Sequence, residues 1–168
     1  MKVGLIGCVL VVWFHGLFGV ACFAQQDPGE VEYREICLIP ESDGAARSVK
    51  FNSYPVDKQI DIYLYSQVAF EGGKGDFLRY IIKNGDKKVL GIFSRIRTEK
   101  RALFRLLLII AIDRIDSETK VFSKRAELLE ELMTLKIVSD EGADAVDRSI
   151  DMDFESIRKE IIDRSKRK

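Results

Sequence analysis

The segment EKRALFRLLLIIAIDRI, residues 99–115, is the most informative stretch of the chain for the fold. Its apolar residues recur at helical spacing on two sides. One side carries Leu103, Leu106, Leu107 and Ile110, and the other carries Phe104, Leu108, Ile112 and Ile115. A helix that is apolar nearly all round is buried on most sides. We therefore expect this helix to lie at the centre of the domain, and its apolar run, 106–112, is too short to span a membrane.

Further helices are predicted on both sides of this segment. Before it, helical spacing of apolar residues indicates helices over about 55–71, 76–83 and 87–97, with Ser53 and Thr98 as candidate caps and Gly85 as a left-handed stop. After it, the pattern predicts helices over about 119–136 and from residue 151 onward, with a further cap at 139–140. Strand-like alternation is scarce after Pro55. The sequence thus predicts an all-α domain, a compact bundle of about five to six antiparallel helices.

The region before this domain looks different. Residues 31–34 (VEYR) alternate between apolar and polar, which favours a short strand or an extended arm, and Pro40 and Gly44 interrupt the pattern. We expect residues 25–53 to form an irregular or extended N-terminal arm, followed by a helical domain over 54–168.

The first 24 residues have the three-part pattern of a secretory signal peptide. Lys2 supplies the positive charge, an apolar run follows, and small residues precede the polar sequence that begins at Gln25. We predict cleavage between Ala24 and Gln25, with cleavage after Ala21 as the alternative. The protein is therefore expected to be exported, either to the periplasm or to the medium.

Two other interpretations of this end stay open. The apolar run is long enough to span a bilayer and could remain as an uncleaved anchor, although its glycines weaken that interpretation. Alternatively, Val20-Ala21-Cys22 is the end of a lipobox and Cys22 is acylated, with Gly19 where such boxes usually carry Leu. Contact with a membrane is expected only under one of these two interpretations.

Charge is balanced, with 27 basic and 27 acidic residues. A nucleic-acid-binding protein usually has a basic excess, so no nucleic-acid partner is predicted. We interpret the basic end of the chain, residues 164–168, as the solvated end of a helix, where positive side chains interact favourably with the negative end of the helix dipole. The alternative is a contact with a membrane or a partner.

Counting residues excludes several kinds of chemistry for the cleaved chain. The single His, His15, lies in the signal region, so no Ser–His–Asp triad, Cys–His dyad or imidazole metal site is expected. Cys37 is the one cysteine beyond residue 24, which rules out an internal disulfide. Its apolar neighbours favour an inert core thiol, with an intermolecular disulfide as the alternative. No catalytic residue, cofactor or metal is therefore predicted.

Two local patterns resemble binding loops only in part. Residues 151–155 (DMDFE) alternate acids as a calcium loop does, but the required Gly and Glu are replaced by Ser156 and Ile162. We interpret these acids as the first turn of a helix. Residues 72–75 (GGKG) lack the spacing of a phosphate loop and are interpreted as a connection between two helices.

The segment YPVDKQIDIYL, residues 54–64, resembles a stretch in uncharacterised exported helical proteins, and the pairs of helices that follow resemble the helix hairpins of HEAT-type repeats. The resemblance covers residues 54–135. It implies a short curved or bundled array of antiparallel helices, a form used for protein contacts, and it supplies no catalytic residue.

These observations favour a non-enzymatic exported or envelope protein that binds another protein, as an adaptor or as an inhibitor of the immunity type. One alternative is a carrier of an apolar ligand or lipid, with its pocket between helices around residues 103–115. Another is a carboxylate-dependent hydrolase, because acids are abundant although no spacing nominates a pair.

Overall fold

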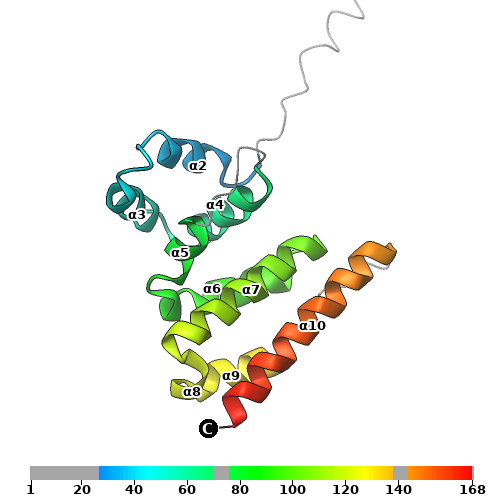
Figure 1. Cartoon of the computed structure of the whole chain (residues 1–168). Helices are drawn as coiled ribbons and strands as arrows, with labels where there is room; N and C mark the ends of the chain where they lie inside the picture. The colour runs from blue at the N-terminus through cyan, green and yellow to red at the C-terminus, as the bar shows by residue number, and fades with distance from the viewer. Residues whose placement is uncertain (1–26, 70–75, 138–143, 168) are drawn as a thin grey trace, which may run out of the picture.

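The computed structural model describes residues 27–69, 76–137 and 144–167, and every regular element within these ranges is a helix (Figure 1). The predicted all-α class is therefore confirmed. In chain order the helices are α2 (Glu30–Cys37), α3 (Gly44–Asn52), α4 (Val56–Val68), α5 (Asp76–Ile82), the 3₁₀ turn η1 (Gly85–Lys87), α6 (Val89–Thr98), α7 (Ala102–Thr119), α8 (Val121–Lys124), α9 (Ala126–Thr134) and α10 (Ala145–Lys166).

The region expected as an irregular arm contains two helices. Within 25–53, the described residues form α2 and α3, so the predicted strand at 31–34 is wrong and the irregular part is the connection over 38–43. Two local features explain the helices. Gly29 begins α2 in a left-handed conformation (φ 87°), where an added Cβ would lie 2.4 Å from the Asp61 carbonyl carbon. The carboxylate of Asp43 caps α3 by accepting a hydrogen bond from the Ala46 amide.

The same short helices explain the position of Cys37. Ile36 is the fully buried residue at the end of α2, and the next position points about 100° away around the helix. Cys37 is therefore exposed, which corrects the expectation of a core thiol.

Helices α4, α5 and α6 lie where they were predicted, but two of their boundary residues act differently. The Ser53 hydroxyl donates to the Lys50 carbonyl at the end of α3, whereas Pro55 occupies the N-cap of α4. Asn84, rather than Gly85, adopts the left-handed conformation after α5 (φ 58°). Gly85 instead packs against α7, because an added Cβ would meet Ile115 at 2.5 Å.

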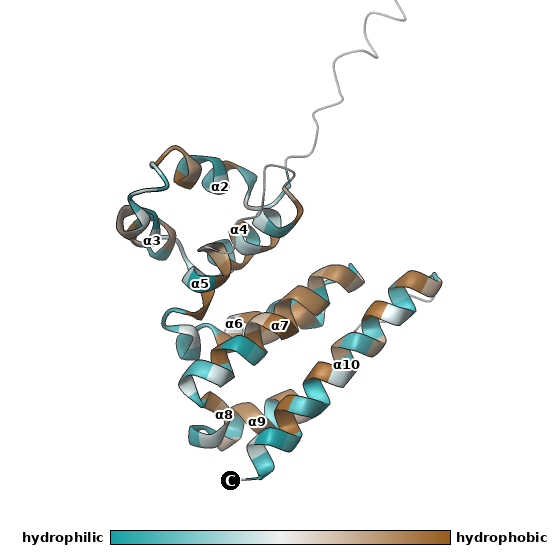
Figure 2. Ribbon diagram, viewed as in Figure 1, coloured by the Kyte–Doolittle hydropathy of each residue, from teal (hydrophilic) through white to brown (hydrophobic). Residues whose placement is uncertain are grey.

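Helix α7 is the central element, as predicted. Its buried side includes Phe104, Leu108, Ile112 and Ile115, and it contacts α5, α6, α8 and α10. Figure 2 shows α7 as largely hydrophobic, whereas hydrophilic and hydrophobic residues alternate along α10. Among the described residues, no helix is both long enough and apolar enough to cross a membrane.

The segment predicted as one helix over 119–136 forms two helices. The helix that follows them, α10, runs in an unexpected direction. Arg125 leaves the helical conformation between α8 and α9. Beyond this, α10 runs alongside α7 in the same direction, as Figure 1 shows from the colours of the two helices. The antiparallel arrangement expected for the bundle is therefore wrong for this pair, which is not joined by a tight turn: α8, α9 and residues 135–144 lie between α7 and α10 in the chain.

Candidate functional site

The residues predicted for processing lie outside the described part of the chain. These are Cys22, Ala24 and Gln25, and the GGKG segment at 72–75 and the cap at 139–140 lie outside it as well. The carboxylates of residues 151–155 are described, and they do not form the first turn of a helix. Helix α10 begins at Ala145 and is capped by Asp144, whose carboxylate accepts from the Val146 and Asp147 amides.

Asp151 instead forms the main polar contact between α10 and α7. Its two carboxylate oxygens accept hydrogen bonds of 2.7 and 2.8 Å from Arg105 Nη2. Arg105 is 1% exposed, and its Nη1 also donates to the main-chain carbonyls of Glu99 and Lys100. Such a charge-assisted, bidentate pair fixes geometry as well as charge. It sets the register of α10 on α7.

A second contact holds the far ends of the same two helices together. Arg164 Nη2 lies 2.8 Å from an Asp113 oxygen and 3.2 Å from an Asp116 oxygen. The other oxygen of Asp116 accepts a hydrogen bond from the Phe122 amide, so the same carboxylate anchors the start of α8. Arg105 and Arg164 therefore tie α10 to both ends of α7.

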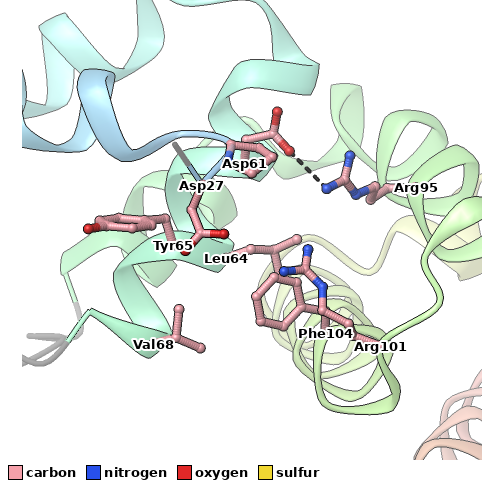
Figure 3. Close-up of a pocket in the computed structure, with 9 residues that line it drawn as sticks. Asp27, Asp61, Leu64, Tyr65, Val68, Arg95, Arg101 and Phe104 are labelled. Carbon is pink, nitrogen blue, oxygen red and sulfur yellow. Dashed lines mark ion pairs between the residues drawn. The ribbon is translucent and has the colours of Figure 1, made fainter. Parts of the chain in front are cut away.

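A further group of charged residues joins α4, α6 and the start of α7, and we call it the junction cluster: Asp61, Arg95, Glu99 and Arg101. Figure 3 shows the Asp61 carboxylate turned towards Arg95, at a nitrogen–oxygen distance of 3.1 Å. Arg95 Nε also lies 3.3 Å from Glu99 Oε2, and Arg101 Nε lies 2.9 Å from Glu99 Oε1. The four side chains thus form an alternating chain of acid and base across three helices.

The two carboxyl groups of the junction cluster have different electrostatic surroundings. Burial raises the pKa of Asp61, and the opposing charges of Arg95 and Lys58 offset this only in part. Burial would also raise the pKa of Glu99, but hydrogen bonds from Arg101 and the charges of Arg101 and Arg95 outweigh it, so this pKa is lowered. Carboxyl groups with divergent pKa values are a feature of acid–base sites, so this cluster is the candidate for the hydrolase alternative.

The cavity beside the junction cluster is very small. It is lined by Asp61, Leu64, Tyr65, Val68, Arg95, Arg101 and Phe104, together with Asp27 and Pro28 (Figure 3). Its volume is about 10 Å³, which is close to the space that one water molecule requires. The Arg101 guanidinium also covers the Phe104 ring at 3.6 Å from its centroid. In this arrangement the cluster joins helices and leaves no room for a substrate.

A larger hollow of about 220 Å³ lies between α4 and α6 and opens to solvent. Its lining is mainly polar and consists of Asp57, Ile60, Gly91, Ser94, Arg95 and Thr98. An apolar-ligand pocket was expected around residues 103–115. Of these residues only Phe104 lines the cavity, and none lines the larger hollow. Within the described ranges, no three His, Cys, Asp or Glu side chains gather as metal ligands.

Lys88 is a buried charge that the sequence did not single out. It is 3% exposed, and its ammonium donates to the Tyr80 carbonyl at 2.6 Å and faces the Phe51 ring at 5.3 Å. Burial, with the nearby charge of Lys83, lowers its pKa to about 8. It connects α3, α5 and the start of α6 and lines neither hollow.

Comparison with models of protein families, with curated proteins and with solved structures finds no match for this chain.

Proposed function

We propose that this is a non-enzymatic exported protein that binds another protein, as an adaptor or an inhibitor. The observation that carries the proposal is the outer face of α10. One side of this helix is held on α7 by Arg105 and Arg164, so the opposite face is presented by a rigid support.

The outer face of α10 has an unusual composition for a solvated helix. Ala145, Ser149, Met152 and Ser156 follow one another at helical spacing and are all exposed. Met152 is 73% exposed. Charged residues make up 32% of the chain, yet these four positions in the first half of α10 carry none. Beyond Ser156 the face continues into the exposed charges of Lys159 and Glu160. Small side chains allow close approach of another surface, and methionine adapts to varied apolar partners.

The junction cluster supports the same proposal. Its carboxylates are engaged with arginines from neighbouring helices, and the adjacent cavity has room for about one water molecule. These contacts stabilise the scaffold, which favours recognition by its outer surface over chemistry in a cleft.

The test is to purify the tagged protein from the envelope or the medium of the cells that make it, and to identify the partner that is recovered with it. Wild type and Met133→Glu, a matched change on α9 at a residue that is 47% exposed, should each recover the same stoichiometric partner. Met152→Glu should lose it, because a charge on the face opposes its burial in an interface. Repeated recovery of no partner would contradict the function, and a partner retained by Met152→Glu would contradict the assigned face.

A further inference from the structure

Four exposed basic residues gather where α7 and α10 both end, and we call them the basic tip: Lys120, Lys124, Lys166 and Arg167. Arg164 brings the end of α10 to Asp116, and Lys120 follows Asp116 by about one helical turn. Lys124 on α8 donates to the Thr119 carbonyl at 2.6 Å, which places its ammonium beside the same turn. In Figure 1 the end of α10 lies beside α8, and the two helices are in contact.

The charges of the basic tip are not neutralised within the described part of the chain. None of the four residues pairs there with an acidic side chain, whereas the nearby Arg125 and Arg164 do. The acids nearest along the sequence are Asp116, Glu118, Glu127 and Asp163, of which Asp116 is paired with Arg164 and Glu127 with Arg125. The parallel α7 and α10 each add a negative helix end of about half a charge. The four cations outnumber the unpaired acids Glu118 and Asp163, whereas Asp113 and Asp116 share the single charge of Arg164.

Lys120 occupies its position at a conformational cost. It is left-handed, with φ 55° and ψ 42°, and it directly joins α7 to α8. Glycine, or less often asparagine, is the usual residue at such a helix end, because other side chains are strained there. Asn84 fills the equivalent position after α5. We interpret a lysine in this strained conformation at an exposed turn as a residue whose side chain has a role.

We propose that the basic tip is a docking point for an acidic segment of the partner protein. The inference rests on the proposed function and names the chemistry of the partner. The alternative of a lipid surface is less well supported, because no exposed large apolar side chain of the described chain lies in 113–125 or 159–167 to enter a bilayer.

The test compares two variants of equal net charge. The tip variant is Lys120→Gly with Lys166→Gln and Arg167→Gln. The control variant is Lys87→Gln with Lys100→Gln and Lys136→Gln, at three exposed lysines elsewhere. Binding of a fluorescein-labelled glutamate-rich peptide is measured by anisotropy at low and high salt. Pelleting with phosphatidylglycerol–phosphatidylcholine vesicles is measured in parallel.

The tip variant should bind the peptide about tenfold more weakly than wild type, with a reduced salt dependence, and the control should bind within about twofold of wild type. The single change Lys120→Gly should weaken binding while the melting temperature stays the same or rises, since glycine relieves the left-handed strain.

Equal loss in both variants would overturn the inference, since it would show unspecific charge attraction. Stronger binding to vesicles than to the peptide, lost in the tip variant, would overturn it in favour of a membrane. Equal recovery of a partner by wild type and by the tip variant would show that the basic tip is not the docking point. It would not contradict the proposed function.

Discussion

The contact between α7 and α10 and the junction cluster use the same kinds of residue with different results. Arg105 and Asp151 meet through three hydrogen bonds, and the remaining Arg105 donor reaches two carbonyls. Arg95 and Asp61 approach to 3.1 Å, yet Arg95 Nε and Asp61 Oδ1 have no hydrogen-bond partner. A buried ion pair is favourable only when its geometry and its remaining hydrogen bonds are complete. The first contact is therefore expected to stabilise the fold, and the second mainly to link helices.

The largest effect is expected for Arg105→Met. The change leaves Asp151 and two carbonyls without their donor, and it should lower the free energy of unfolding by about 3 kcal/mol. Urea unfolding monitored by circular dichroism measures this. Arg97→Met, which breaks the exposed pair with Glu131, is the control and should cost less than about 1 kcal/mol. A loss at Arg105 no larger than that at Arg97 would contradict the comparison.

A buried charge that has no acidic partner among the described residues extends the comparison. Burial lowers the pKa of Lys88 to about 8 in the folded protein, below its usual value of 10.5, so the unfolded chain binds more protons between these values. Stability should therefore rise as pH increases from about 8 towards 10, and below 8 both states are protonated and the cost is constant. Burial also raises the pKa of Tyr63, but the resulting change of stability with pH begins only above about pH 10.

Lys88→Met should remove this rise and should stabilise the protein at neutral pH by about 1–2 kcal/mol. Urea unfolding from neutral pH to about pH 10 measures both effects. Lys87→Met, at the exposed neighbour, is expected to keep the wild-type profile. An unchanged rise in the Lys88 variant would show that other groups cause it.

The smallest effect is expected for Asp61→Asn. The raised pKa of Asp61 means that folding disfavours its charged form, so removal of the charge at neutral pH should change the free energy of unfolding by less than about 1 kcal/mol, in either direction. Asp151→Asn should cost about 2 kcal/mol, because it weakens charge-assisted hydrogen bonds to a buried arginine. Equal losses in the two variants would remove the distinction between the contacts.

The sequence predicted what depends on local pattern. The apolar spacing of residues 99–115 placed the central helix, and the segments at 55–71 and 76–83 placed α4 and α5. The short helices α2 and α3 were missed, because eight or nine residues give too few turns to separate helical spacing from alternation. Arg105 did carry a signal, since a charge between Phe104 and Leu106 in a buried helix requires a partner.

The identity of that partner could not be predicted, because it depends on the packing of distant segments. Asp151 lies 46 residues away along the chain, and several other acids of the last helix were equally available. The junction cluster was missed for the same reason. Asp61, Arg95 and Arg101 look like solvated charges in the sequence and become related only when α4, α6 and α7 meet.

The parallel course of α10 also has a consequence for the order of folding. A parallel neighbour cannot be joined by a tight turn, so the side of α7 that α10 covers stays open while α8 and α9 are formed. Phe154 and Ile161, which are fully buried, reach α7 only when almost the whole chain has emerged. Closure of long loops slows folding, and an incomplete chain exposes an apolar surface that favours aggregation.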